Sequence, residues 1–474
     1  MRLGISSVDW QTNNRQSGSW SRRQFLRATG LAGLAAPFFS SCRTSPRAHR
    51  TATGRLRHAS IGVGGMGWND LQNFLKHPRV DVVALCDVDA NTLHKAAQVA
   101  PKAGLYADWR ELLSSEGGQI DSVNVAVPDH MHFAIAYTAV RAGKHVYCQK
   151  PLCHDIAEVR ALTRAAVRKG VVTQLGTQEA SSVHERTAVR WLRDGVIGKV
   201  THAYLCSNRP GAVETYRLKG PRPAKGQPPP PELSWDLWLG TAPERPFAPD
   251  IYHPTKWRAW LDFGTGWSGD IGCHIFDPVW KGLELKAPRH VWAEVQESWK
   301  NSPERRADNW PQGDHIVWSF PANKHIAGQE LTLEWFDGEF FPPDHIRKLA
   351  TNDLSEYPTE SSMLIGTEGS LLIPHGFPPQ LFPEEKFRTV ERPAFSPRNH
   401  YHHFVDACLG GEPTESHFAQ TGPMTEAILL GTVAIRMPED KLFWEPARLG
   451  FANRPEANCL LARTYRDGWH VGRF

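Results

Sequence analysis

The sequence predicts an α/β protein in which a doubly wound parallel sheet comes first and a strand-rich domain follows. After residue 56, short apolar runs alternate with helical stretches, which is typical of βαβ units. Farther along, apolar runs at 291–296, 316–320 and 331–336 have the character of strands in a sheet. The chain has 474 residues, enough for two or three domains, and its 41% hydrophobic content excludes wholesale disorder.

The first βαβ unit carries a nucleotide-binding fingerprint. A strand expected over 57–61 runs into Gly62-Val63-Gly64-Gly65-Met66-Gly67, and a helical stretch follows to residue 76. A buried strand over 80–86 then ends at Asp87, twenty residues after Gly67. In this layout glycines admit a pyrophosphate to the helix N-terminus, and the carboxylate binds ribose hydroxyls. Because a carboxylate repels a 2′-phosphate, Asp87 favours NAD over NADP; the alternative is a glycine-rich turn with an incidental aspartate.

The α/β alternation continues with strands expected over 120–127, 144–148 and 171–175 and helices over 133–142 and 155–169. Ligands of open α/β sheets lie at the carboxyl ends of the strands. We therefore expect the cofactor to contact Gly62, Gly64, Gly65, Met66, Gly67, Asp87, Pro128, His132, Gln149, Lys150 and Gln178.

The charge of the chain gives no case for nucleic-acid binding. The net charge is +4, and residues 1–42 hold five arginines against a single aspartate, so the remainder is neutral. The 18 tryptophans suit either sugar faces or an ordinary core, and composition alone leaves both open.

The N-terminus resembles a twin-arginine export signal. Arg22 and Arg23 precede an apolar run over 28–39, which is too short to span a bilayer because about 20 residues are needed. We expect residues 1–42 to be a signal peptide, 43–55 a linker, and the mature protein to be periplasmic. Phe39-Ser40-Ser41-Cys42 resembles a lipoprotein cleavage box, so Cys42 is a candidate lipid anchor; ordinary cleavage nearby is the alternative. The seven other cysteines form no C-x-x-C pair, which argues against a disulfide framework and against a zinc site.

Four segments of the first domain resemble the Gfo/Idh/MocA oxidoreductases. They are Gly62–Gly67, Val127-Pro128-Asp129-His130-Met131-His132, Ala142–Val146 and Lys150-Pro151. The resemblance implies a Rossmann domain over 56–178 that binds NAD. It also implies an α+β C-terminal domain over 179–436, built on a large, mostly antiparallel sheet, and a homo-oligomer formed through that sheet. Residues 437–474 remain as a C-terminal tail. The chain departs from the usual Glu-Lys-Pro at Gln149, which removes an anion next to Lys150.

The second domain supplies further candidate catalytic groups. The segment from Trp267 to Asp277 resembles the D-x-G-x-H segment of the family, and a helix over 268–283 would place Asp270 and His274 on one face. Without the resemblance, an N-cap aspartate and a core histidine would be the simpler interpretation. A metal site of Asp270, His274 and Asp277 is a weaker alternative because no zinc motif accompanies it.

Two residues upstream of this helix are candidates for binding substrate. Trp257 and Arg258 lie in a segment that resembles exported, polysaccharide-linked members of the family, and the arginine could bind hydroxyls through its planar fork or simply pack on the tryptophan. His400, His402 and His403 are expected on the polar face of a late helix rather than at a metal.

The resemblance implies an NAD-dependent oxidoreductase that acts on a sugar or sugar derivative. His274 would take the hydroxyl proton, Lys150 would stabilise the substrate oxygen, and Asp270 would orient substrate or His274. An exported enzyme must restore its bound cofactor in every turnover. It does so either by oxidising one sugar and reducing another, or by transient oxidation of a glycoside that leads to hydrolysis or elimination. A non-catalytic sugar-binding lipoprotein is the third hypothesis, and the joint presence of Lys150, Asp270 and His274 argues against it.

Overall fold

The computed structural model of the protein describes residues 54–209, 222–223 and 225–472. The signal peptide expected over 1–42, Cys42 and nearly all of the expected linker lie outside these residues. Among the described helices, none is both long and apolar enough to cross a membrane.

The first domain is a six-stranded parallel sheet in the order β3-β2-β1-β4-β5-β6, which confirms the predicted doubly wound fold. Its strands are β1 (Leu56–Ile61), β2 (Val80–Cys86), β3 (Gly104–Tyr106), β4 (Ser122–Val125), β5 (His145–Cys148) and β6 (Thr173–Leu175). Its helices are α2 (Met66–Leu75), α3 (Ala90–Val99), α4 (Trp109–Glu116), α5 (Asp129–Arg141) and α6 (Ile156–Lys169).

The starts of two of these helices follow directly from the sequence. Asp89 caps α3 by accepting hydrogen bonds from the backbone N–H groups of Asn91 and Thr92. At α6, Asp155 and Glu158 form a reciprocal capping box.

The second domain is built on a nine-stranded sheet in the order β13-β12-β11-β7-β10-β9-β8-β14-β15. The β7–β10 pair is parallel and the other pairs are antiparallel, which confirms the large, mostly antiparallel sheet. The strands are β7 (Val200–Ser207), β8 (His290–Val295), β9 (Asp314–Pro321), β10 (Glu330–Asp337), β11 (Glu360–Gly366), β12 (Ser370–Pro374), β13 (Gln380–Phe382), β14 (Leu442–Glu445) and β15 (Gly450–Phe451). The sheet therefore extends past residue 436, where we had placed the start of a tail.

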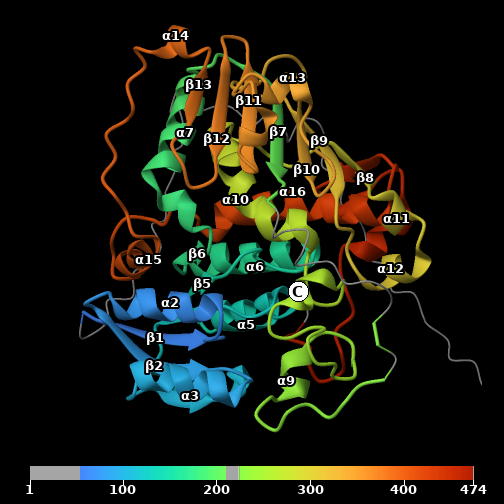
Figure 1. The fold of residues 1–474 in the computed structure, drawn as a ribbon. Coiled ribbons are helices and arrows are strands. Elements are labelled where there is room, and N and C mark those ends of the chain that lie inside the picture. The colour runs from blue at the N-terminus through green and yellow to red at the C-terminus, as the bar shows by residue number, and fades with distance from the viewer. Residues whose placement is uncertain (1–53, 210–221, 224, 473–474) are drawn as a thin grey trace, which may run out of the picture. The chain divides into compact units, whose positions relative to one another are not determined.

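Three long helices cover one face of this sheet: α7 (Val183–Asp194), α10 (Gly266–Gly282) and α16 (Phe418–Arg436). In Figure 1, α10 and α16 lie between the large sheet and α6. Helix α16 packs against both α6 and β8, and α10 packs against β7, β10 and β11, so these helices connect the two domains through one continuous core.

The remaining described helices are short. They are η1 (Gln178–Ser181), α9 (Trp235–Leu239), η2 (Lys256–Ala259), α11 (Glu297–Lys300), α12 (Pro303–Asp308), α13 (Asp344–Arg347), η3 (Leu354–Glu356), α14 (Glu384–Phe387), α15 (His400–Cys408) and η4 (Pro455–Leu460). In α15, His400 and His403 are buried rather than on a polar face, and His400 contacts the Ser181 hydroxyl at 2.8 Å.

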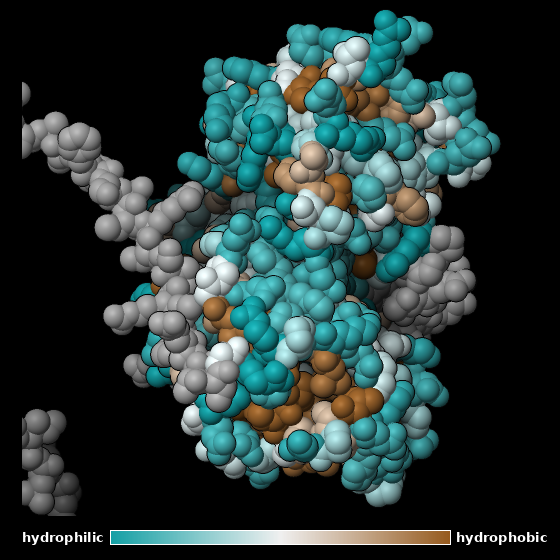
Figure 2. Space-filling view, turned by 90° about the vertical axis from the view of Figure 1, so that its left-hand side faces the viewer, coloured by the Kyte–Doolittle hydropathy of each residue, from teal (hydrophilic) through white to brown (hydrophobic). Residues whose placement is uncertain are grey.

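Most of the described tryptophans are buried, so they belong mainly to the core. The face shown in Figure 2 is largely hydrophilic, with hydrophobic side chains gathered in its lower part. The seven described cysteines are free thiols, and six of them are buried.

Candidate active site

The glycine-rich turn between β1 and α2 favours glycine at three positions for different reasons. Gly62 has φ +79°, and a Cβ there would lie 2.2 Å from the carbonyl oxygen of Ala126. A Cβ on Gly67 would lie 2.1 Å from the carbonyl oxygen of Gly62, so Gly67 lets the helix approach the turn. A Cβ on Gly65 would meet nothing within 4 Å, and glycine is favoured there by its φ of +52° alone. The turn thus leaves open space at the start of α2, where a pyrophosphate would bind.

Asp87 is fixed at the end of β2 by backbone hydrogen bonds. Its Oδ2 accepts from the N–H of Val63 at 2.9 Å, and its Oδ1 accepts from the N–H of Asp89 at 3.0 Å. Burial raises the pKa of this carboxyl, whereas the two N–H donors lower it. The carboxylate is therefore tied to the glycine-rich turn and lines the same cavity.

This cavity has a volume of about 460 Å³, within the range of small-molecule sites. One wall comes from the glycine-rich turn and the carboxyl ends of the parallel strands, and the other from residues 237–258. Its described cations are Lys150 and Arg258, and both interact with Asp270 rather than with Asp87. The donor set fits NAD: open space at the helix N-terminus, a carboxylate for the ribose, and, among the described residues, no lysine or arginine paired with that carboxylate. The expected residues that line the cavity are Gly62, Gly64, Gly65, Met66, Asp87, Pro128, Gln149, Lys150, Trp257 and Arg258.

Three of the expected cofactor residues lie outside the lining. Gly67 is buried beneath the turn. His132 is buried, with its ring nitrogens 2.7 Å from the carbonyl oxygen of Pro151 and 2.8 Å from that of Val127. Gln178 donates a hydrogen bond to the Tyr401 hydroxyl at 3.2 Å. Of the three, His132 supports the backbone around the cavity, since both carbonyls that it contacts belong to residues in or next to the lining.

Lys150 and Asp270 form an ion pair between the two domains. Lys150 follows β5, and its Nζ lies 2.6 Å from Oδ1 of Asp270 and 3.1 Å from the Asp270 carbonyl oxygen. The other carboxylate oxygen lies 3.4 Å from Nε of Arg258. Burial alone would raise the pKa of Asp270, but Lys150 and Arg258 outweigh it and lower the pKa to about 2. Asp270 is therefore ionised and positions two cations at the edge of the cavity.

His274 lies one turn after Asp270 on α10. Burial, together with Lys150 and His375, holds its pKa well below 6.5, so the imidazole is neutral at pH 7. Its Nδ1 is enclosed and has no hydrogen-bond partner among the described residues. The ring lines a separate small cavity with Glu179 and His375, and its centroid is 5.0 Å from that of His375. The structure thus places a neutral proton acceptor near the Lys150–Asp270 pair.

Asp129 is a buried carboxyl that lines the cofactor cavity, and it was not among the site residues expected from the sequence. It begins α5 and accepts a hydrogen bond from Thr265 Oγ1 at 2.9 Å. Burial and the charge of Asp270 raise its pKa to about 7. The segment 127–132 was used for the family resemblance, and Pro128 and His132 were selected from it, but nothing in the sequence indicated that Asp129 would face Asp270.

The departure at Gln149 has a structural explanation. Its Nε2 donates to both carboxylate oxygens of Asp70, at 3.0 and 2.9 Å, and Tyr401 donates to the same carboxylate at 2.9 Å. Asp70 lies on α2, and burial raises its pKa to about 6 despite these donors. A glutamate at position 149 would place a second carboxylate against Asp70. Lys150 is not left without an anion, because Asp270 supplies it.

Arg258 packs on Trp257, with its guanidinium carbon 4.2 Å from the ring centroid, while its Nε faces Asp270. The packing interpretation of this arginine is therefore confirmed, and its binding of substrate hydroxyls stays a prediction. Among the described residues, no group of three or more metal-ligating side chains is assembled, and Asp277 instead pairs with Lys281 at 2.7 Å.

Comparison with known proteins agrees with this geometry. A model described as "Oxidoreductase family, NAD-binding Rossmann fold" matches residues 56–177, and one described as "Oxidoreductase family, C-terminal alpha/beta domain" matches 185–302. The chain belongs to the Gfo/Idh/MocA oxidoreductase family. Its NAD-binding Rossmann domain and its enzyme class, expected from the sequence, are thereby confirmed.

Curated relatives of two kinds match the chain. A D-apiose dehydrogenase of Paraburkholderia graminis is 33% identical over 148 residues, which cover 31% of this chain and 39% of the relative. A glycosyl hydrolase family 109 protein of Saccharopolyspora erythraea is 30% identical over 210 residues, covering 39% and 45%. The aligned parts thus span less than half of these relatives.

Solved structures share the fold over a longer stretch. An aldose-aldose oxidoreductase of Caulobacter crescentus aligns with TM-score 0.54 and 15% identity, over 82% of this chain and all of that chain. An inositol dehydrogenase homolog of Azotobacter vinelandii, complexed with NADH and myo-inositol, aligns with TM-score 0.52 and 16% identity, over 82% and 98%.

Proposed function

We propose that the protein is an NAD-dependent oxidoreductase that acts on a sugar or sugar derivative. The observation that carries this proposal is the meeting of Lys150 and Asp270, 120 residues apart, at the edge of the cavity that also contains Asp87. When bound, NAD would supply a nicotinamide ring that accepts a hydride and can return it. The dehydrogenases among the relatives and the sugar ligand of the inositol dehydrogenase homolog support the substrate class.

The roles of the chain's own residues follow from their charges. Ionised Asp270 holds the Lys150 ammonium in place, so Lys150 donates a hydrogen bond to the substrate oxygen and stabilises negative charge there. Neutral His274 accepts the hydroxyl proton. Proton transfer to a positioned side chain typically raises the reaction rate by about 10²–10⁴-fold. Asp270 is thus a positioning residue for Lys150, in addition to any contact with substrate.

Cleavage of a glycoside through transient oxidation is the second candidate function. The glycosyl hydrolase family 109 relatives favour it.

One experiment separates these functions. Purified protein is incubated with free sugars and with aryl glycosides, while absorbance at 340 nm and released aglycone are followed together. A lasting change at 340 nm with free sugars supports net oxidation or reduction. Aglycone release without net NADH supports cleavage. If protein that contains NAD gives no change at 340 nm and releases no aglycone, both proposals are contradicted.

We also propose that the protein is exported through the twin-arginine pathway and forms a homo-oligomer through the large sheet. The paired Arg22 and Arg23 support export, and the family resemblance supports the oligomer. The Arg22→Lys, Arg23→Lys double variant should accumulate as cytoplasmic precursor; an unchanged periplasmic yield would exclude the pathway. Cys42→Ala should abolish membrane association if Cys42 is lipidated, and light scattering of the purified protein measures the oligomer.

A further inference from the structure

A segment outside the parallel sheet forms the second wall of the cofactor cavity. We name residues 232–258 the cover segment; it supplies Leu237, Trp238 and the stretch 253–255 to the lining, besides Trp257 and Arg258. Its first end is tied to the domain that holds the cofactor. Ala90 N–H donates to the carbonyl of Glu232 at 2.9 Å, and Ser234 N–H donates to that of Val88 at 2.9 Å. A dinucleotide bound in the cavity would lie between the parallel sheet and the cover segment.

The cover segment is held in turn by residues 461–469, which we name the C-terminal clasp. Arg466 makes most of the contacts. Its Nη2 donates to the carbonyl of Asp236 at 2.9 Å, its Nη1 to the Asp236 carboxylate at 2.5 Å, and its Nε to the carbonyl of Gly240 at 3.2 Å. The Arg466 N–H also donates to the carbonyl of Thr241 at 3.3 Å. The Arg466 side chain therefore binds backbone carbonyls both within α9, at Asp236, and just after it, at Gly240.

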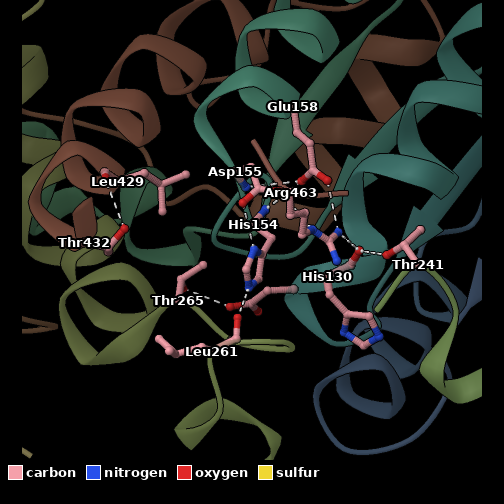
Figure 3. A network of polar contacts seen from close by, with 12 residues as sticks. His130, His154, Asp155, Glu158, Thr241, Leu261, Thr265, Leu429, Thr432 and Arg463 are labelled. Atoms are coloured by element: carbon pink, nitrogen blue, oxygen red, sulfur yellow. Dashed lines mark hydrogen bonds and ion pairs between the residues drawn. The ribbon is translucent and has the colours of Figure 1, made fainter. Parts of the chain in front are cut away.

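Arg463 anchors the clasp to the first domain, as Figure 3 shows. Its Nε lies 2.9 Å from Asp155 and its Nη2 lies 3.0 Å from Glu158, both at the start of α6. Nη2 also donates to the carbonyl of His130 at 2.5 Å, and Thr241 Oγ1 donates to the same carbonyl at 2.8 Å. The clasp and the end of α9 thus share one acceptor in α5, the helix that begins at the cavity wall with Asp129.

The far end of the clasp contacts another element of the cofactor-binding domain. Trp469 is buried, and the guanidinium carbon of Arg110 lies 4.2 Å from its ring centroid. That guanidinium pairs with Asp108 at 2.6 Å, and Asp108 lines the cavity. The clasp therefore contacts the cofactor-binding domain at α4 as well as at α5 and α6.

We propose that the C-terminal clasp controls dissociation of the cofactor by holding the cover segment over it. This inference rests on the proposed NAD site, and it adds Arg466 as a residue that retains the cofactor without touching it. For the dinucleotide to leave, the cover segment must move, and it can move only when the bonds of Arg466 break. By linkage, a cofactor that stabilises the closed cover must also stabilise the clasp.

The test measures release of NADH from loaded protein by the change in its fluorescence after mixing with excess NAD. Arg466→Ala should release NADH at least about 10-fold faster than wild type, with little change in thermal stability of the loaded core. Asp236→Asn should have a smaller effect, because Arg466 keeps its two backbone acceptors. The matched control is Arg448→Ala, since Arg448 is an exposed arginine that pairs with Glu445 at 3.0 Å near the same end of the chain. Equal release rates for wild type and Arg466→Ala would overturn the proposal.

Hydrogen exchange of the wild-type protein provides a second, independent readout. Adding NADH to cofactor-free protein should slow exchange of amides in both 232–241 and 461–469, whereas 442–445 in β14 should change little. Protection confined to 232–241 would overturn the role of the clasp even if Arg466→Ala failed to fold. Wild-type protein that binds no NADH would contradict the proposed function instead, so the two failures are distinguishable.

Discussion

Replacing Asp270 by asparagine removes the carboxylate that lies between Lys150 and Arg258. These cations lower the pKa of Asp270 from 3.8 to about 2. At about 1.4 kcal/mol per pKa unit, this difference corresponds to about 2 kcal/mol of folding free energy at neutral pH. Because the folded-state pKa is the lower one, the contribution is complete above the unfolded pKa and is lost as the pH falls through about 2. At pH 3 about half of it should remain.

The assay is urea denaturation of wild type and Asp270→Asn at pH 7 and pH 3. The loss of unfolding free energy in the variant should be about twice as large at pH 7 as at pH 3. Asp440→Asn is the matched control, since Asp440 forms a more exposed pair with Arg454 at 2.7 Å and should cost less than about 1 kcal/mol. An Asp270→Asn effect that is independent of pH, or no larger than that of the control, would refute the reasoning that Asp270 is an ionised partner of both cations.

Four other variants test the remaining roles. Lys150→Ala and His274→Ala should each reduce turnover by at least about 10²-fold while NAD stays bound, measured as single-turnover reduction of the bound cofactor beside thermal unfolding; folded His274→Ala protein with wild-type rates would remove His274 from the mechanism. The unfolding free energy of Asp129→Asn relative to wild type should be at least about 1 kcal/mol larger at pH 8 than at pH 5. The reason is that the wild-type protein, whose Asp129 carboxyl has a pKa raised to about 7, loses folding free energy as the pH rises toward that value. Asp87→Ala should purify without NAD, as mass spectrometry of the denatured supernatant would show; retained NAD, or a wild type that carries NADP, would count against the assignment.

Five of the six strands of the parallel sheet could be predicted from the sequence because they are short apolar runs bounded by turns, whereas β3 (Gly104–Tyr106) was not predicted and β4 and β6 are shorter than expected. The strand expected over 80–86 is β2 as observed, and the helix expected over 268–283 is α10 at Gly266–Gly282. Helix α16 begins at Phe418 and contains Pro423, a residue type that is more typical of helix boundaries, so the first turn of this helix carries no clear sequence signal. Residues 437–474 gave no periodic signal, since β14 and β15 are short strands defined by their long-range partners.

The candidate site could be predicted only in part. The glycine-rich turn and Asp87 are local patterns, so composition and spacing were sufficient to find them. The pairing of Lys150 with Asp270 depends on how α10 packs against the parallel sheet, and spacing along the chain carries no such information. His375 and Asp129 were missed for the same reason, because each acquires its chemical context from another element: His375 from α10, and Asp129 from Asp270 and Thr265.

Gln149 shows how one substitution is understood only with its distant partner. In the sequence, Gln149 stands where the family usually has a glutamate, so the anion beside Lys150 is missing. In the structure its amide binds both oxygens of Asp70, a carboxylate that α2 brings to the end of β5. An amide there provides hydrogen donors where a glutamate would place a like charge on a buried group whose pKa is already raised to about 6. The negative charge next to Lys150 comes instead from Asp270, in the second domain. The ion pair of Lys150 with Asp270 therefore forms only when the two domains are packed together, so the proposed catalytic arrangement depends on the interface between α10 and the parallel sheet.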